Sequence, residues 1–259
     1  MQRHHHRIIA YTLTGAIIAA LSVQYINYRY QPATEYAPIN YRVPVESAIK
    51  NTSEKTVKHS VIPTPSDVPK ILLLKVPFTP QAPTANWDEL HNEACEEASA
   101  IMTERYFAGD SRATLPPQEV EDQLNILTQW ENNHFGYHLD IDSQETAQMI
   151  KEVYGLQAKI ILNFTEDDIK KELSQNHIVL LPSNGKLLGN PNFRSPGPPY
   201  HMLVLKGYTA TQFITNDPGT RKGQNYPYTF ATLYHANGIF DHATHSVDLK
   251  KKNIIVVWK

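Results

Sequence analysis

Three residue types that together can carry out nucleophilic catalysis occur in the order cysteine, histidine, aspartate. Cys95 is the only cysteine among 259 residues, so no intramolecular disulfide can form and the thiol either fills space or does chemistry. His201 precedes the apolar run Met-Leu-Val-Leu, and Asp217 follows the run Phe-Ile-Thr-Asn. A thiol nucleophile, a histidine that moves its proton and a carboxylate that orients the histidine are the parts of a hydrolytic triad.

The residues around Cys95 would shift the pKa of its thiol in opposite directions. Asn92 is a good N-cap residue, which predicts that Cys95 lies in the first turn of a helix. There the helix dipole would stabilise a thiolate, and the backbone N–H of Cys95 would be free to donate. Three nearby glutamates would raise the pKa of the thiol, namely Glu93, Glu96 and Glu97. An active Cys95 therefore requires a protonated His201 close to its sulfur.

Gln81 is the fourth candidate, on a proline-stiffened loop upstream of Cys95. Its amide and the Cys95 N–H could together stabilise an oxyanion. Asn216 is an alternative to Asp217 as the partner of the His201 ring. Each candidate also has a purely structural interpretation: a small core cysteine, a surface histidine at a strand start, an aspartate in an Asn-Asp-Pro-Gly turn and an ordinary loop glutamine.

Three stretches of the chain resemble the stand-alone bacterial members of the C39-like cysteine peptidases. These are papain-like relatives of the peptidases that process bacteriocins and double-glycine leaders. The stretches are Val-Pro-Phe-Thr-Pro-Gln-Ala-Pro followed by Glu-Ala-Cys-Glu-Glu-Ala-Ser, then Tyr-His-Met-Leu-Val, then Asn-Asp-Pro-Gly-Thr, and the resemblance covers residues 72–258. It implies Gln81 as oxyanion donor, Cys95 as nucleophile, His201 as acid/base and Asp217 as its orienter. It also implies a peptide or protein substrate and no cofactor.

The chain departs from the transporter-linked members of that family at the nucleophile. Those members have Cys-Gly-Pro-type surroundings, whereas this chain has Cys-Glu-Glu and carries no transporter domains. Cleavage of leader peptides therefore does not follow from the resemblance. The Cys-Gly-Ser-Cys-Trp run of papain is also missing.

The elements that must position these residues are helices first and strands afterwards. Helical periodicity and end signals predict helices over residues 94–108, 118–133 and 144–154, with Ser143 as the cap of the third. Shorter helices are expected over residues 165–175 and 230–236, and a long loop over residues 183–199. Strands are expected over residues 71–76, 158–162, 178–181, 202–208, 213–216 and 254–258. This order predicts an α+β, papain-like fold, in which a helical lobe carries the cysteine helix and packs on an antiparallel sheet.

The N-terminal 69 residues differ in kind from the rest. Residues 8–28 contain no charged side chain, and about 20 apolar residues are enough to cross a bilayer. Arg3 and Arg7 before this stretch favour a cytoplasmic N-terminus. We therefore expect a signal-anchor transmembrane segment over residues 1–30, a proline-rich extended linker over 31–69 and a peptidase domain over 70–259. A cleaved signal peptide is the alternative, and either places the domain outside the cytoplasm.

Composition and spacing argue against other classes of function. The chain has 24 Lys and Arg against 26 Asp and Glu, so no basic field for nucleic acid is expected. The acidic and histidine residues between 235 and 248 match no zinc spacing, and no metal site is predicted. The leading hypothesis is a membrane-anchored, extracytoplasmic cysteine peptidase. The alternatives are a non-catalytic module that binds peptides or cell-wall fragments, and a transglutaminase-like acyl transferase. The sequence does not indicate an oligomeric state.

Overall fold

The computed structural model describes residues 68–259. The expected anchor over residues 1–30 and nearly all of the expected linker over 31–69 lie outside the described residues. Within residues 68–259, no helix combines the length and the hydropathy that a membrane crossing needs. The described residues belong to one compact unit.

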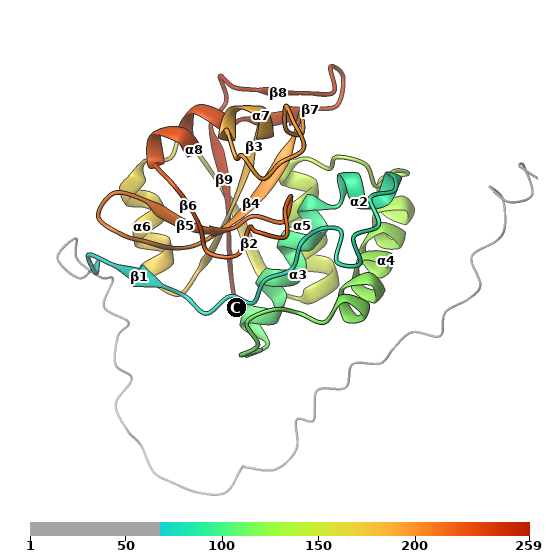
Figure 1. The fold of residues 1–259 in the computed structure, drawn as a ribbon, viewed down its shortest axis with the longest axis horizontal. Helices are drawn as coiled ribbons and strands as arrows, with labels where there is room; N and C mark the ends of the chain where they lie inside the picture. The colour runs from blue at the N-terminus through green and yellow to red at the C-terminus, as the bar shows by residue number, and fades with distance from the viewer. Residues whose placement is uncertain (1–67) are drawn as a thin grey trace, which may run out of the picture. The chain divides into compact units, whose positions relative to one another are not determined.

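Helices dominate the first half of the described chain and strands the second half (Figure 1). The helices are α2 Glu89–Glu93, α3 Cys95–Phe107, α4 Pro117–His134, α5 Ser143–Tyr154, α6 Glu166–Ser174, α7 Gly185–Leu188 and α8 Phe230–Ala236. The strands are β1 Leu72–Leu73, β2 Gln157–Leu162, β3 Ile178–Ser183, β4 His201–Tyr208, β5 Phe213–Asn216, β6 Tyr226–Tyr228, β7 Ile239–Asp241, β8 Ser246–Asp248 and β9 Asn253–Trp258. The predicted α+β class with an antiparallel sheet is confirmed.

The main sheet is antiparallel, with the strand order β2-β9-β3-β4-β5-β6. β1 pairs with the far end of β4, where Leu73 lies opposite Gly207. A Cβ at Gly207 would stand 2.3 Å from the backbone oxygen of Leu72, so only glycine allows this approach. At its other end β4 pairs with β3, and Ser183 lies opposite His201. His201 is thus the first residue of an interior strand of the sheet, at the end of β4 that is opposite β1.

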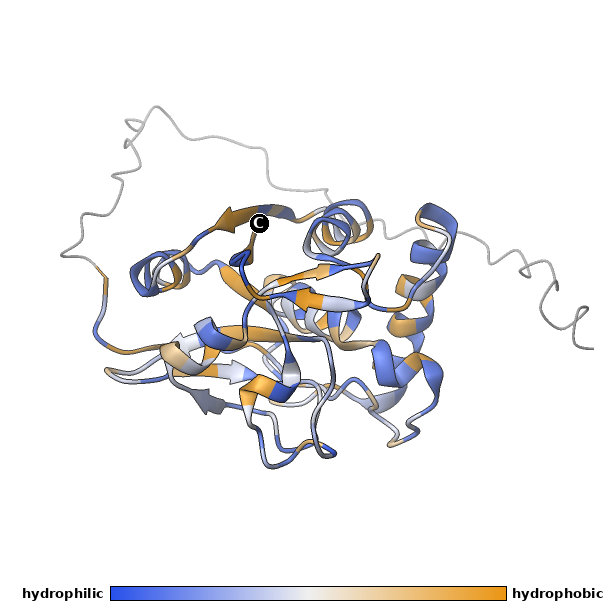
Figure 2. Ribbon diagram, turned by 90° about the horizontal axis from the view of Figure 1, so that it is seen from above, coloured by the Kyte–Doolittle hydropathy of each residue, from blue (hydrophilic) through white to orange (hydrophobic). Residues whose placement is uncertain are grey.

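The core lies between the sheet and the helices that pack on it. α3 packs on β4, α5 packs on β2, and α4 contacts both of these helices. β4 is buried along its whole length, and so is β3. Figure 2 shows the hydrophobic segments concentrated on the central strands, with hydrophilic residues prevailing on the outer helices. Continuous burial on both faces explains the unbroken apolar runs Ile-Val-Leu-Leu in β3 and Met-Leu-Val-Leu in β4.

Local capping accounts for where the main helices begin and end. At α5 the cap is Asp142, which forms a reciprocal capping box with Glu145, and Ser143 is the first helical residue. The prediction of Ser143 as the cap is therefore wrong by one residue. Gly155 ends this helix at φ 66°, a left-handed conformation that favours glycine.

Three short elements differ from the sequence-based expectation. The strand expected over residues 71–76 shrinks to β1, although the Leu74 N–H still donates to the backbone oxygen of Lys206 in β4 at 2.7 Å. The loop expected over 183–199 contains α7, which is capped by the Asn184 side chain. A separate hairpin, β7–β8, occupies part of the segment between α8 and β9.

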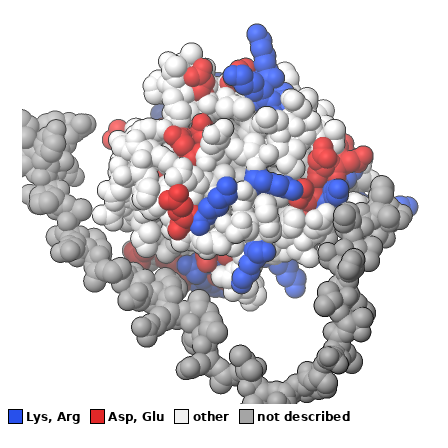
Figure 3. Space-filling model, turned by 180° about the vertical axis from the view of Figure 1, so that it is seen from behind, with Lys and Arg blue, Asp and Glu red and all other residues white. Residues whose placement is uncertain are grey.

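Charge on the surface is mixed in sign. On the face drawn in Figure 3, Lys and Arg side chains lie interspersed with Asp and Glu. Arg112, for example, forms ion pairs with both Asp110 and Glu119.

Candidate active site

Cys95 is the first residue of α3, directly after a break in the helical path. The single-turn helix α2 precedes it and is capped by the Asp88 side chain. Asn92 lies inside α2 and donates its amide to the carbonyls of Trp87 and Asp88, so the prediction of Asn92 as N-cap is wrong. Ala94 occupies the cap position of α3 instead. Cys95 nevertheless lies in the first turn, where backbone N–H groups lack partners within their own helix.

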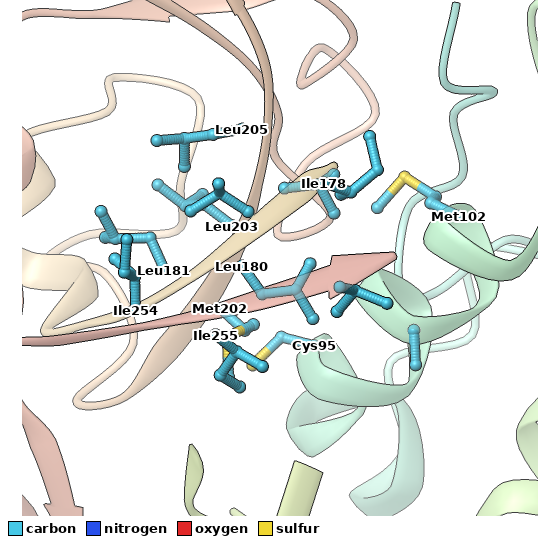
Figure 4. Close-up of a cluster of buried hydrophobic side chains, with 14 of the residues drawn as sticks. Cys95, Met102, Ile178, Leu180, Leu181, Met202, Leu203, Leu205, Ile254 and Ile255 are labelled. Atoms are coloured by element: carbon cyan, nitrogen blue, oxygen red, sulfur yellow. The ribbon is translucent and has the colours of Figure 1, made fainter. Parts of the chain in front are cut away.

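The thiol of Cys95 is buried and points toward the sheet. Its side chain belongs to the hydrophobic core and lies beside Met202 of β4 in Figure 4. The sulfur donates a hydrogen bond to Oε2 of Glu96 at 3.0 Å. Burial raises the pKa of the Cys95 thiol well above its ordinary value, and the Glu96 carboxyl raises it further. In this arrangement the thiol is protonated.

His201 and Asp217 form a buried pair. His201 Nε2 lies 2.8 Å from Oδ1 of Asp217, and both side chains are almost completely inaccessible to solvent. The carboxylate of Asp217 also accepts hydrogen bonds from the Gly219 N–H, the Asn190 amide and the Tyr228 hydroxyl. An aspartate held by four donors cannot turn away from the histidine, which fixes the orientation of the imidazole.

Two neighbours restrict the His201 ring further. Phe193 packs edge-on against it, with ring centroids 5.2 Å apart. A Cβ at Gly219 would lie 2.8 Å from Cε1 of His201, so the ring fits only against glycine. Because Asp217 engages Nε2, Nδ1 is the nitrogen left for a reacting group. No hydrogen bond joins the His201 ring to the Cys95 thiol in the described structure.

Gln81 is buried and ties together the segments that flank the candidate residues. Its Nε2 donates to the backbone oxygens of His91 and Asn92, at 2.9 and 3.0 Å. Its backbone N–H donates to the oxygen of Pro218, the residue after Asp217. The side-chain oxygen of Gln81 is buried without a partner among the described residues. In this state the amide protons hold α2 in place.

Asn216 does not take the place of Asp217 as a partner of His201. Its amide donates to the backbone oxygens of Val76 and Pro77, at 3.2 and 3.0 Å. Asn216 therefore fixes the start of the loop that carries Gln81. The contact to His201 comes from Asp217.

A group of buried carboxyls lies around the start of α3. Glu96, Glu97 and Glu131 are almost completely inaccessible, and each has at least one oxygen without a partner in the described structure. Burial raises the pKa of Glu96 well above its ordinary value and that of Glu97 to about 7. Burial also raises the pKa of Asp140 to about 8, and the neighbouring Glu93 adds to this effect.

Sequence reasoning missed Glu131, although a signal was present. Val120, Leu124 and Leu127 form a buried stripe along α4, and the same helical spacing continues to Glu131. A glutamate in register with an apolar stripe is buried unless the helix ends before it. Asn190 and Tyr228, the other supports of Asp217, carry no such signal, because each lies alone in a polar or turn-rich segment.

The histidine-rich segment near the end of the chain supplies one member of a small acidic group. Ligand atoms of Asp142, Glu145 and His242 lie within 4.8 Å of one another. Glu145 already accepts the Asp142 N–H at 2.8 Å as part of the α5 capping box, and His242 lies 2.9 Å from the same oxygen. The contacts among these three residues are therefore those of an ordinary helix N-terminus.

The fold and these residues agree with one family of peptidases. The profile of the peptidase C39-like family matches residues 73–240, which include Gln81, Cys95, His201 and Asp217. The chain belongs to the peptidase C39-like family. No curated protein matches it by sequence. Among solved structures, a candidate C39-like peptidase from Bacillus anthracis is similar, with 16% identity and a TM-score of 0.47 over 74% of this chain and 98% of that one.

Proposed function

We propose that the protein is a cysteine peptidase in which Cys95 is the nucleophile, His201 the acid/base and Asp217 the residue that orients His201. The observation that carries the proposal is the buried His201–Asp217 contact of 2.8 Å, in which four donors hold the carboxylate. A purely structural histidine does not need an aspartate fixed in this way. The first-turn position of Cys95 and membership of the peptidase family support it.

The proposed reaction begins with transfer of the Cys95 thiol proton to Nδ1 of His201. The thiolate attacks the peptide carbonyl, and the Cys95 N–H stabilises the oxyanion. His201 then gives the proton to the leaving amine, and the C–N bond breaks. Water, deprotonated by His201, hydrolyses the thioester and restores the thiol. Gln81 contributes a second oxyanion donor if one of its Nε2 protons turns from the carbonyls of α2 toward the substrate.

The proposal requires the Cys95 sulfur to exchange its hydrogen bond to Glu96 for one to His201. This exchange requires a rotation about one bond of the Cys95 side chain, in the first turn of α3. The structure therefore corresponds to a resting thiol, and substrate binding or protonation changes would favour the reactive rotamer.

Hydrolysis of a mixed-sequence peptide library, followed by mass spectrometry, tests the proposal. The wild-type chain should generate new termini, and Cys95→Ala and His201→Ala should each abolish them. Asn92→Ala is the matched control, because Asn92 is exposed and precedes the nucleophile by three residues. Cleavage that survives Cys95→Ala would overturn the assignment of the nucleophile. Adding an amine and looking for amide products separates hydrolysis from acyl transfer.

We also propose that residues 8–28 anchor the protein in a membrane, with the domain outside the cytoplasm. The support is the uncharged stretch and the two preceding arginines. In intact cells, an added protease should degrade the domain without lysis, and deletion of residues 1–30 should release it from the membrane fraction. Protection of the domain in intact cells would contradict this orientation.

A non-catalytic peptide-binding module is the second candidate. The observation that favours it is the Cys95 thiol itself, which is buried and bonded to a carboxyl group with a raised pKa. In that case Cys95→Ala would leave peptide binding intact, and no peptide in the library would be cleaved.

A further inference from the structure

Glu96 is the only residue whose side chain forms a hydrogen bond with the Cys95 sulfur in the described structure. Both side chains are buried, with exposed fractions of 3% for Cys95 and 0% for Glu96. The second oxygen of Glu96 has no partner. A buried carboxylate with a single weak S–H donor is poorly stabilised, so the neutral acid is the form that this environment favours.

The groups that act on this pair are acidic or neutral. They are Glu97 of α3, Glu131 of α4, Asp140 before α5 and Tyr200 at the start of β4, and Glu93 of α2 acts in turn on Glu97 and Asp140. The main charges that shift the pKa of Glu96 are those of Glu97 and Asp140, and no lysine or arginine side chain forms an ion pair with Glu96 in the described structure. A second negative charge on the pair is therefore not compensated by any fixed cation.

We propose that Glu96 is a positioning residue for Cys95, and that its protonation state decides whether the sulfur can become a thiolate. This rests on the proposed peptidase function. When Glu96 is neutral, its O–H donates to the sulfur, and the thiol proton can pass to Nδ1 of His201. When Glu96 is ionised, it accepts the S–H instead and holds the thiol in its protonated form. The nucleophile is then available at acidic pH and blocked as the pH rises.

The pH dependence has a definite sign. Burial, followed by the charges of Glu97 and Asp140, raises the pKa of the Glu96 carboxyl, so its neutral form persists above the ordinary value of 4.5. A thiolate paired with protonated His201 is stable only while Glu96 stays neutral. Reactivity should therefore fall as Glu96 ionises, and return only at strongly alkaline pH, where the thiol ionises despite the carboxylate.

Alkylation of the full-length chain by iodoacetamide between pH 4 and pH 10 tests this. Because Cys95 is the only cysteine, the intact mass reports on this one sulfur. The wild-type rate should fall between acidic and mildly alkaline pH. Glu96→Gln keeps the size and offers an N–H in place of the ionisable carboxyl. It should remove the fall and raise the rate at pH 8 by about tenfold or more, the equivalent of one pKa unit.

Glu97→Gln is the matched control, because Glu97 is an equally buried carboxyl on the same helix with no hydrogen bond to the sulfur. It should raise the rate at pH 8 by much less than Glu96→Gln. An equal effect of both variants would overturn the proposal, since it would assign the effect to the general field and not to the contact. An unchanged profile in Glu96→Gln would overturn it too.

Two further measurements test the proposal: the pH profile of the wild-type chain and that of His201→Ala. If Glu96→Gln does not fold, the wild-type profile alone decides: a monotonic rise with pH, as for a free thiol, contradicts the proposal. His201→Ala separates this inference from the function on which it rests. If the wild-type and His201→Ala profiles coincide, the triad fails, whereas a faster Glu96→Gln at pH 8 still supports the contact between Glu96 and Cys95.

Discussion

The buried carboxyl groups of Glu97 and Glu131 make stability depend on pH in an unusual direction. Glu131 of α4 is fully buried and faces Glu97 of α3. Burial, followed by the charge of Glu97, raises the pKa of Glu131 far above its ordinary value of 4.5, and burial raises that of Glu97 to about 7. In the unfolded chain both carboxyls ionise near 4.5, so above that pH the folded chain binds more protons than the unfolded chain.

The sign follows directly from proton linkage. The contribution of such groups to the free energy of unfolding is greatest below pH 4.5 and declines as the pH rises. The loss amounts to ~1.4 kcal/mol per pH unit for each extra proton that the folded state keeps. From pH 5 to pH 7 the pair would lose up to ~5 kcal/mol if both protons were kept throughout. Structural relaxation and water entry reduce this upper limit, which is nevertheless comparable with the whole stability of many domains.

Glu131→Gln removes one of the two carboxyl groups that keep a proton in the folded chain. A glutamine at this site stays neutral in both states and can donate its amide to Glu97. We expect the decline between pH 5 and pH 7 to become shallower by up to ~1.4 kcal/mol per pH unit. The variant should be about as stable as the wild type near pH 4.5, and more stable at pH 7 by ~1–3 kcal/mol.

Urea unfolding followed by circular dichroism at several pH values measures this difference. Asp122→Asn is the control, because Asp122 is exposed on the same helix and should leave the slope unaltered. A wild-type chain that becomes more stable from pH 5 to pH 7 would refute the reasoning. A Glu131→Gln variant with the wild-type slope would show that the buried pair does not hold the proton.

Three further predictions concern the histidine side of the site and the sheet. Gly219→Ala should reduce peptide cleavage at least tenfold while the chain stays folded, because the added Cβ would lie 2.8 Å from Cε1 of His201. Tyr228→Phe removes one of the four donors to Asp217 and should lower the free energy of unfolding by ~1–2 kcal/mol, measured by urea unfolding, with a smaller effect on cleavage than Gly219→Ala. Burial lowers the pKa of Lys206 from 10.5 to about 8, so the folded chain gives up this proton first and the free energy of unfolding should rise between those values. Lys206→Met should abolish that rise, and a rise that persists would assign it to another group.

The strongest patterns of the sequence predicted the framework of the fold. The apolar run of β5 and the periodic segment of α8 have the bounds expected from the sequence, and the cysteine helix differs by a residue at each end. α2 escaped prediction because a single helical turn has no measurable period. The strands of the β7–β8 hairpin are too short to show alternation.

The candidate site was predictable as a set of residues, and not as a set of contacts. Asn-Asp-Pro-Gly is typical of an exposed turn, yet Asp217 is fully buried, because donors from distant segments converge on it. The contact between Cys95 and Glu96 depends on side-chain rotamers, which no spacing rule determines. The catalytic roles of Cys95, His201 and Gln81 stay predictions until the variants are measured.

The position of β9 in the sheet has a consequence for how the protein is made. β9 follows the other strands of this sheet in sequence, yet it lies between β2 and β3. β2 pairs with residues 253–258 of β9, and β3 pairs with residues 255–257. Until residues 253–258 have left the ribosome, β2 has no partner in the sheet and one edge of β3 is unpaired. Completion of this sheet therefore has to wait until residues 253–258 have been synthesised. The peptidase proposed here would stay inactive, and open to chaperones or an export machinery, while its chain is still growing.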